Sequence, residues 1–159
     1  MTIKLGDVAK DKITQFTGVV AGITKRLTNV DSYTLCPQKV NADGTPAKMR
    51  SFDATACQFV KASKVRVMPV DRVAHPPDLG DVIEANITGL TGVVTAITTW
   101  IEGCVLLEVQ PTKLTKDGEP PERLGYDERS VKVLRRAKPK PAPVRTGGPR
   151  PEPIRAVSR

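Results

Sequence analysis

The sequence predicts an all-β protein made of two tandem small barrels and an extended C-terminal tail. Segment 4–26 returns as segment 78–100, and about 18 of about 56 aligned positions are identical at a constant shift of about 74 residues. Short runs rich in Val, Ile and Thr alternate with glycines, and no useful length of the chain has the 3.6-residue period of a helix. The stretch 135–159 is rich in proline and basic residues, which is typical of an extended segment.

These patterns divide the chain into a first barrel at 1–62, a linker at 63–77, a second barrel at 78–134 and the tail at 135–159. Each repeat has roughly 55–60 residues, which is near the lower limit for a self-sufficient core. Only 4% of the residues are aromatic. We therefore expect contacts between the two units, or with other chains, to contribute to stability.

Each repeat should contain five short antiparallel strands, because runs of four to eight β-branched residues bounded by Gly or Pro are typical of strands. The first opens with Leu-Gly-Asp-Val and the second contains Thr-Gly-Val-Val, while the third ends at a proline. Asp-Gly pairs then mark a turn before two final short strands. The last three strands are expected at 29–37, around Phe52 and at 57–60 in the first unit, and at 103–111, around Tyr126 and at 131–134 in the second.

Two pairs of glycines should shape these barrels. Gly6 and Gly80 are expected at the entrance of the first strand of each unit. Gly18 and Gly92 are expected at the start of the second strand, where a tight barrel must bend its chain. In the linker, Lys64–Pro69 could form an additional strand or bridge, and His75-Pro76-Pro77 should be extended.

The net charge of +8 is concentrated in the tail. Segment 135–159 carries about +7 and the rest of the chain about +1, which argues against a basic face within the folded units. The sequence contains no run of about 18 apolar residues, so no membrane span is expected, and the N-terminus lacks the apolar core of a signal peptide. The chain has three cysteines, Cys36, Cys57 and Cys104, and none of them is shared between the repeats. We therefore expect small buried side chains in a reducing compartment.

No catalytic residue, cofactor or metal site is predicted. The single histidine lies in the linker, no Cys-x-x-Cys is present, and no Ser or Cys lies beside a plausible base. Two carboxylates recur in both units, as Asp7 with Asp81 and Asp53 with Asp127. Proton transfer by such a pair is one interpretation, but aspartates near glycines and strand ends usually bind turn backbone.

The Gly6-Asp7-Val8 opening, followed by Gly18, Val20 and Ile23, resembles the KOW pattern of SH3-like barrels, and the second unit repeats it. The two repeats also resemble small virion-associated proteins of tailed bacteriophages and prophages. The matching residues are Leu5-Gly6-Asp7-Val8, Lys10–Val20, Pro37, Phe52-Asp53 and Tyr126-Asp127-Glu128. This resemblance implies SH3-like barrels and a structural role in a phage particle, and it carries over no catalytic residue.

Two functions are therefore open. The first is a non-enzymatic capsid decoration or cement protein, or a protein of the head–tail region. It would dock on the major capsid protein or another virion subunit, and strap neighbours with its tail. Self-association in a symmetric assembly is a further partner interaction that this role allows. The second is a nucleic-acid-binding module that uses the basic tail. Trp100 could contact a partner from a loop or could pack between the barrels. The predicted partner-binding tail residues are Arg135, Arg136, Lys138, Lys140, Val144, Arg145, Arg150, Ile154, Arg155 and Val157.

Overall fold

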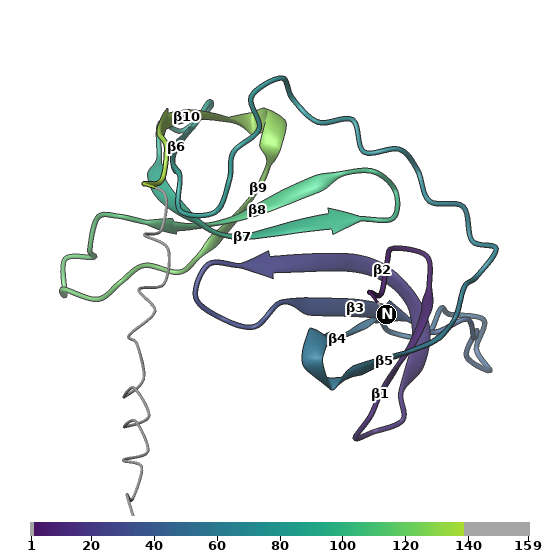
Figure 1. Ribbon diagram of the computed structural model, residues 1–159. Helices are drawn as coiled ribbons and strands as arrows, with labels where there is room; N and C mark the ends of the chain where they lie inside the picture. The colour runs from purple at the N-terminus through teal and green to yellow at the C-terminus, as the bar shows by residue number, and fades with distance from the viewer. Residues whose placement is uncertain (1, 139–159) are drawn as a thin grey trace, which may run out of the picture.

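The computed structural model describes residues 2–138, and within that range the protein is all-β (Figure 1). Ten strands form one open antiparallel sheet, and the only helical elements among the described residues are two single 3-10 turns, Ala54–Ala56 and Glu128–Ser130. The predicted all-β class is confirmed. Across the described part of the chain, no helix is long and apolar enough to span a membrane.

Each repeat forms a unit of five strands, close to the positions expected from the sequence. In each unit the first strand pairs with the second and the fifth, the second with the third, and the third with the fourth. The strands are β1 (Val8–Asp11), β2 (Thr17–Arg26), β3 (Ser32–Cys36), β4 (Arg50–Asp53), β5 (Cys57–Lys61), β6 (Val82–Ala85), β7 (Thr91–Trp100), β8 (Val105–Pro111), β9 (Leu124–Asp127) and β10 (Val131–Arg135).

The two units are joined edge to edge by β2 and β7, which lie antiparallel in the middle of the molecule (Figure 1). Thr24 pairs with Thr98, its own equivalent in the other repeat, and their hydroxyl oxygens are 2.8 Å apart. A pseudo-twofold axis therefore passes between these two threonines. The register pairs are Gly22–Trp100, Ile23–Thr99, Thr24–Thr98, Lys25–Ile97 and Arg26–Ala96.

Hydrogen bonds beyond the ladder obey the same symmetry. The Leu27 amide donates to the Thr95 carbonyl at 2.9 Å, and the Ile101 amide donates to the Ala21 carbonyl at 2.8 Å. These two bonds exchange under the shift that relates the repeats. The expected contacts between the units thus form a symmetric interface along β2 and β7, which is called the seam below.

A bulge in the second strand of each unit makes this seam possible. One edge of β2 pairs with β1 through residues 17–19 and with β7 through residues 22–26. In the pairing of β2 with β3 the register shifts between Val20 and Gly22, so β2 has one extra residue there. In the pairing of β7 with β8 it shifts at the equivalent place, between Val94 and Ala96. The extra residue increases the local twist, so that β2 leaves its own unit and reaches the other.

Gly18 and Gly92 lie at the start of the second strands, as predicted, but the bulges that bend those strands lie a few residues further along. The two glycines are needed for close approach instead. A Cβ at Gly18 would lie 2.7 Å from the Cys36 carbonyl, and one at Gly92 would lie 2.8 Å from the Gln110 carbonyl oxygen. Gly6 and Gly80 do precede the first strands, each with a φ of +84°.

Each unit has its own apolar core, filled in a different way. Ala9 and Cys57 in the first unit occupy the positions of Ile83 and Val131 in the second. The smaller side chains of the first core are compensated by packed aromatic rings, Phe16, Tyr33, Phe52 and Phe59, where the second unit has Leu90, Leu107, Tyr126 and Val133. A third cluster crosses the seam, because Ile101 of the second unit packs on Val8, Val19 and Ala21 of the first.

Candidate partner-binding clefts

Each unit has an exposed turn between its first two strands. In the first unit the Asp11 carboxylate accepts hydrogen bonds from the Thr14 hydroxyl at 2.6 Å and from the Thr14 amide at 2.7 Å. These bonds, the hydroxyl bond foremost, hold the pKa of Asp11 below its ordinary value. Gln15 and Gly89 adopt the same left-handed conformation, with φ of 61° and 68°. The two turns are therefore equivalent in shape, although only the first has a carboxylate clasp.

Each unit also has a long loop before its fourth strand, folded back by the Asp-Gly turn. In the first loop the Asn41 amide donates to the Thr45 carbonyl at 2.8 Å, and in the second the Thr115 amide donates to the Glu119 carbonyl at 2.9 Å. The Thr45 hydroxyl donates to the Asp43 carboxylate at 2.6 Å and lowers its pKa. The predicted turn chemistry thus shapes both loops.

A cleft lies between the turn and the loop of each unit. The first has a volume of about 620 Å³ and the second about 540 Å³. Eight lining positions are equivalent between the repeats, with apolar side chains inside and a lysine kept in both clefts. The equivalent pairs are Gln15–Gly89, Phe16–Leu90, Thr17–Thr91, Pro37–Pro111, Lys39–Lys113, Val40–Leu114, Asn41–Thr115 and Ala47–Pro121.

Large apolar side chains are exposed at equivalent places in both units. Ile13 and Ile87 at the turn tips are 84% and 95% exposed, and Val40 and Leu114 beside the clefts are 69% and 64% exposed. A single exposed apolar residue is ordinary on a protein surface. Here, however, the exposure recurs at the same positions in two units that differ at most other positions.

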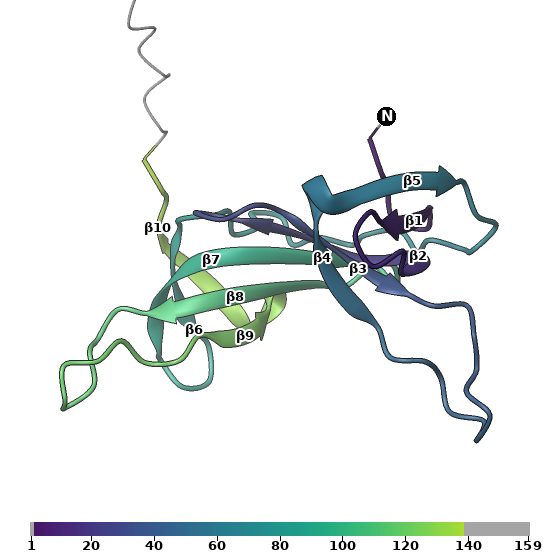
Figure 2. The same cartoon turned by 90° about the horizontal axis from the view of Figure 1, so that it is seen from below.

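The two clefts belong to opposite ends of the molecule. The β3–β4 loop and the β8–β9 loop extend away from each other in both views of the ribbon (Figures 1 and 2). The seam between β2 and β7 lies between them and carries the pseudo-twofold axis. The protein therefore has two similar clefts at opposite ends of one sheet.

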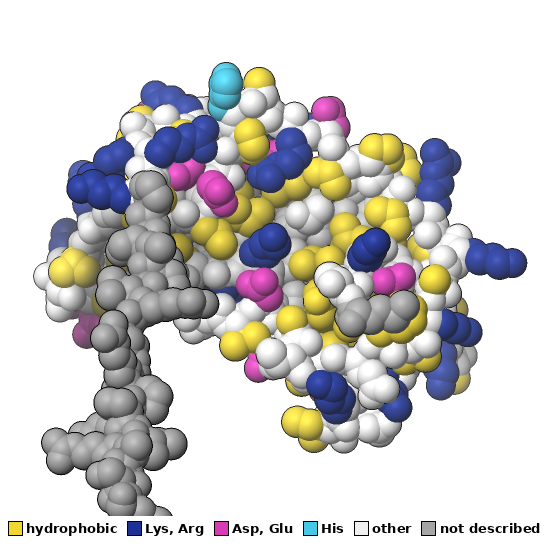
Figure 3. Space-filling model, in the orientation of Figure 1, with side chains coloured by type: hydrophobic (Ala, Val, Ile, Leu, Met, Phe, Trp, Pro, Cys, Tyr) yellow, Lys and Arg dark blue, Asp and Glu magenta, His cyan; other side chains and the backbone are white. Residues whose placement is uncertain are grey.

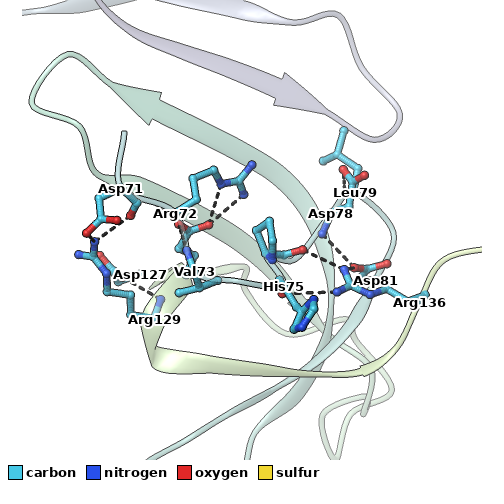
Figure 4. Close-up of polar contacts among 12 residues, drawn as sticks. Asp71, Arg72, Val73, His75, Asp78, Leu79, Asp81, Asp127, Arg129 and Arg136 are labelled. Carbon is cyan, nitrogen blue, oxygen red and sulfur yellow. Dashed lines mark hydrogen bonds and ion pairs between the residues drawn. The ribbon is translucent and has the colours of Figure 1, made fainter. Parts of the chain in front are cut away.

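The linker is bound to the second unit by ion pairs and backbone contacts (Figure 4). The buried Glu128 carboxylate accepts both the Nε and a terminal nitrogen of Arg72, at 3.0 and 2.9 Å. Arg129 binds Asp71 at 3.2 Å on the exposed side. The linker thus runs along the second unit, and Lys64–Pro69 forms no strand but one bridge-like bond, from the Met68 amide to the Ile101 carbonyl at 2.9 Å.

The start of the predicted tail is bound within the chain. Arg135 is the last residue of β10, and Arg136 pairs with the buried Asp81 carboxylate at 2.8 Å (Figure 4). The Ala137 amide donates to the other Asp81 oxygen at 2.7 Å. Arg136 therefore contacts its own chain in place of the partner expected from the sequence. Lys138 is the last described residue. The other predicted tail residues lie outside the described residues: Lys140, Val144, Arg145, Arg150, Ile154, Arg155 and Val157.

Trp100 is not a loop residue, so the loop contact predicted for it is replaced by the alternative, packing between the units. It ends β7 and lies against Gly22 of β2, where an added Cβ would be 3.0 Å from the indole ring. The indole nitrogen is buried and has no hydrogen-bond partner among the described residues. Gly22 leaves the space that this ring fills at the seam.

The duplicated carboxylates have structural roles at three of four positions. Asp7 accepts the Lys4 amide, Asp81 accepts three donors, and Asp127 accepts the Arg129 amide, whereas Asp53 accepts none at its 3-10 turn. The interpretation that they bind turn backbone holds for those three. No group of three or more His, Cys, Asp or Glu side chains gathers within residues 2–138.

The cysteines follow their predicted burial only in part. All three are free, and Cys57 is buried, which raises the pKa of its thiol. Cys36 is half-buried, but Cys104 is exposed in the turn after β7. The prediction that all three are buried is therefore wrong for Cys104.

The chain matches no known protein-family model, and it shows no significant similarity to a curated protein or to a solved structure. The candidate site therefore depends on the internal repeat. Sequence reasoning did not select the cleft residues, although one signal was present: Lys39 and Lys113 are identical in loops that otherwise share little beyond the Asp-Gly pair and one proline.

Proposed function

We propose that this protein is a non-enzymatic structural component of a tailed-phage particle, most simply a capsid decoration or cement protein located in the virion. Its clefts would dock on the major capsid protein or on another repeating virion subunit. The observation that carries this proposal is the duplication of an apolar cleft at two opposite ends of one sheet. The resemblance of the repeats to phage virion proteins supports the choice of partner.

Within this proposal each unit is an SH3-like barrel. Five antiparallel strands in which the first pairs with both the second and the fifth support that assignment. The positions of the glycines also support it: Gly6 and Gly80 precede the first strands, and Gly18 and Gly92 lie at the close approach of the second and third strands. The fold alone does not define the role, because small barrels serve many functions.

A repeating partner fits the symmetry of the protein. Neighbouring copies of one subunit present the same surface, and two similar clefts can each bind one copy. Once one cleft is bound, the other is held at a high local concentration near its own site, which strengthens attachment without new contacts. Lys39 and Lys113 favour a partner segment that is apolar with a carboxylate beside it.

The basic residues beyond Lys138 would then act as a strap over acidic surface of neighbouring subunits. An extended segment can contact a large area for its size, at the cost of roughly 1–2 kcal/mol of backbone entropy per ordered residue. The partner surface would therefore have to be extensive.

Co-sedimentation with purified capsids tests the docking surface. The double variant Val40→Asp/Leu114→Asp places a charge in each cleft and should lower capsid binding by at least about tenfold, whereas each single variant should retain part of it. Val30→Asp is the matched control, because Val30 is an exposed apolar residue whose equivalent is the cysteine Cys104. Equal binding by the double variant and the control would contradict the proposal, and so would absence of the protein from intact particles by mass spectrometry.

The same variants separate docking from nucleic-acid binding. On the face shown in Figure 3, several Lys and Arg side chains gather at the upper left edge, and elsewhere they are separated by apolar and acidic side chains. The chain outside 135–159 carries a net charge of only about +1. Retention on DNA at low salt should therefore depend on segment 139–159 and not on the clefts. Retention of the full chain on DNA at physiological salt, together with no binding to capsids, would favour the nucleic-acid module that uses the tail instead.

A further inference from the structure

A groove beside the seam is left open at one of two symmetry-equivalent places. The groove has a volume of about 550 Å³ and is lined by Arg26, Leu27, Asp78, Leu79, Asp81, Arg136, Ala137 and Lys138. It lies where the turn after β2 meets the entrance to β6. Its counterpart, where the turn after β7 meets the entrance to β1, is covered by the linker segment 64–70.

The contacts of segment 64–70 show what such a groove binds. The Val67 side chain lies over Gly6, and the Pro69 carbonyl oxygen lies 2.5 Å from the position of a Cβ at Gly103. Between them the Met68 amide donates to the Ile101 carbonyl at 2.9 Å. The segment therefore leaves the first unit and fastens onto the turn of the second.

The symmetry mate of Ile101 is Leu27, and it lacks this bond. Both residues donate their amides across the seam in the same way. None of the described residues, however, donates a hydrogen bond to the Leu27 carbonyl. Within residues 2–138, this groove thus has no donor equivalent to the Met68 amide.

The repeat continues in the sequence far enough to supply that donor. At the shift that relates the two units, Lys64-Val-Arg-Val-Met-Pro-Val70 aligns with Lys138-Pro-Lys-Pro-Ala-Pro-Val144. Three positions are identical, one conserves a basic residue, and the other three remain apolar. Met68 corresponds to Ala142, whose amide is flanked by prolines and has no competing amide neighbours.

We infer that segment 138–144 of the same chain occupies the open groove, with the Ala142 amide donating to the Leu27 carbonyl. The chain is already fixed at the mouth of the groove, because Ala137 and Arg136 are bound to Asp81 and Lys138 lines the wall. At the far end of the groove Asn29 replaces Gly103, so a Cβ stands where the Pro69 carbonyl approaches in the first groove, and Pro143 and Val144 would have to lie further from the turn. Each unit is then clamped by a segment that emerges from the other.

This inference does not depend on the phage role, and it limits what the tail can do. Only residues 145–159 remain free to reach a partner, a span of at most about 50 Å when fully extended.

Amide hydrogen exchange of the full chain, measured by NMR, tests the inference. The Ala142 amide should exchange at least about tenfold more slowly than an unstructured chain, with the Met68 amide as the internal reference. Ala142→Pro, which removes the donor, should change the chemical shift of the Thr28 amide, which shares its peptide group with the Leu27 carbonyl, whereas the control Ala156→Pro should not. Exchange of the Ala142 amide at its intrinsic rate, with Met68 still protected, would overturn the inference. Protection that disappears on dilution would assign the segment to a second copy and would also overturn it.

Discussion

Ile101 provides the most direct test of the seam. The side chain belongs to the second unit but packs on Val8, Val19 and Ala21 of the first, and it is only 9% exposed. Truncation of a buried isoleucine to alanine costs about 2–5 kcal/mol, because transfer free energy is lost and a cavity remains. Since Ile101 lies at the margin of the cluster, we expect Ile101→Ala to lower the free energy of unfolding by about 2–3 kcal/mol.

Urea denaturation followed by circular dichroism measures this loss. A chain of this size should have a slope of about 2 kcal/mol per molar urea, so the midpoint should fall by about 1 M. Ile87→Ala is the matched control, because the same atoms are removed from a side chain that is 95% exposed, and its effect should stay within about 0.5 kcal/mol. Equal midpoints for the two variants would refute the cross-unit packing on which the seam argument depends.

Three further predictions concern single positions. Gly92→Ala should destabilise the fold by about 1–3 kcal/mol, because its Cβ would meet the backbone of the neighbouring strand, whereas Gly125→Ala meets nothing within 4 Å and should be nearly neutral by thermal unfolding. The pKa of Asp11 is lower in the folded chain than its ordinary value of 3.8, so the carboxylate stabilises the fold above that pH and this contribution is lost as the pH falls through the folded pKa. In denaturation curves, the stability difference between the wild type and Asp11→Asn should therefore shrink below about pH 4. A difference that stays constant from about pH 6 to about pH 2 would contradict this. Asp81→Ala should lower the thermal midpoint more than Asp7→Ala, because it leaves a bound arginine and two amides without their acceptor, and an equal loss would show that these bonds contribute little.

The sequence was sufficient to predict the strands and the turns, because these depend on local patterns. Runs of β-branched residues, the Asp-Gly turns and the terminal prolines all describe a few neighbouring positions. Each of these local signals also recurs at the constant shift between the repeats. This consistency between local signals and their duplication is why all ten strands were found near their expected places.

The pairing of β2 with β7 could not be predicted in the same way. A strand edge carries no sequence signal of its partner, since its hydrogen-bonding groups are those of any backbone. The two residues in contact there are Gly22, which has no side chain, and Trp100, which has a large one. They belong to different repeats, so neither predicts the other. Only the folded chain shows that the two face each other. The clefts were missed for a related reason, because each combines a turn with a loop that is distant in sequence.

The bulges within β2 and β7 have a mechanical consequence. They direct both long strands into one ladder, which runs along the line that joins the two distal loops (Figure 1). A pull on those loops loads the ladder parallel to its strands, so its bonds must break together, because bonds between antiparallel strands lie across the strand direction. The molecule should therefore resist stretching as a stiff spacer, and the separation of its two ends is fixed by the fold.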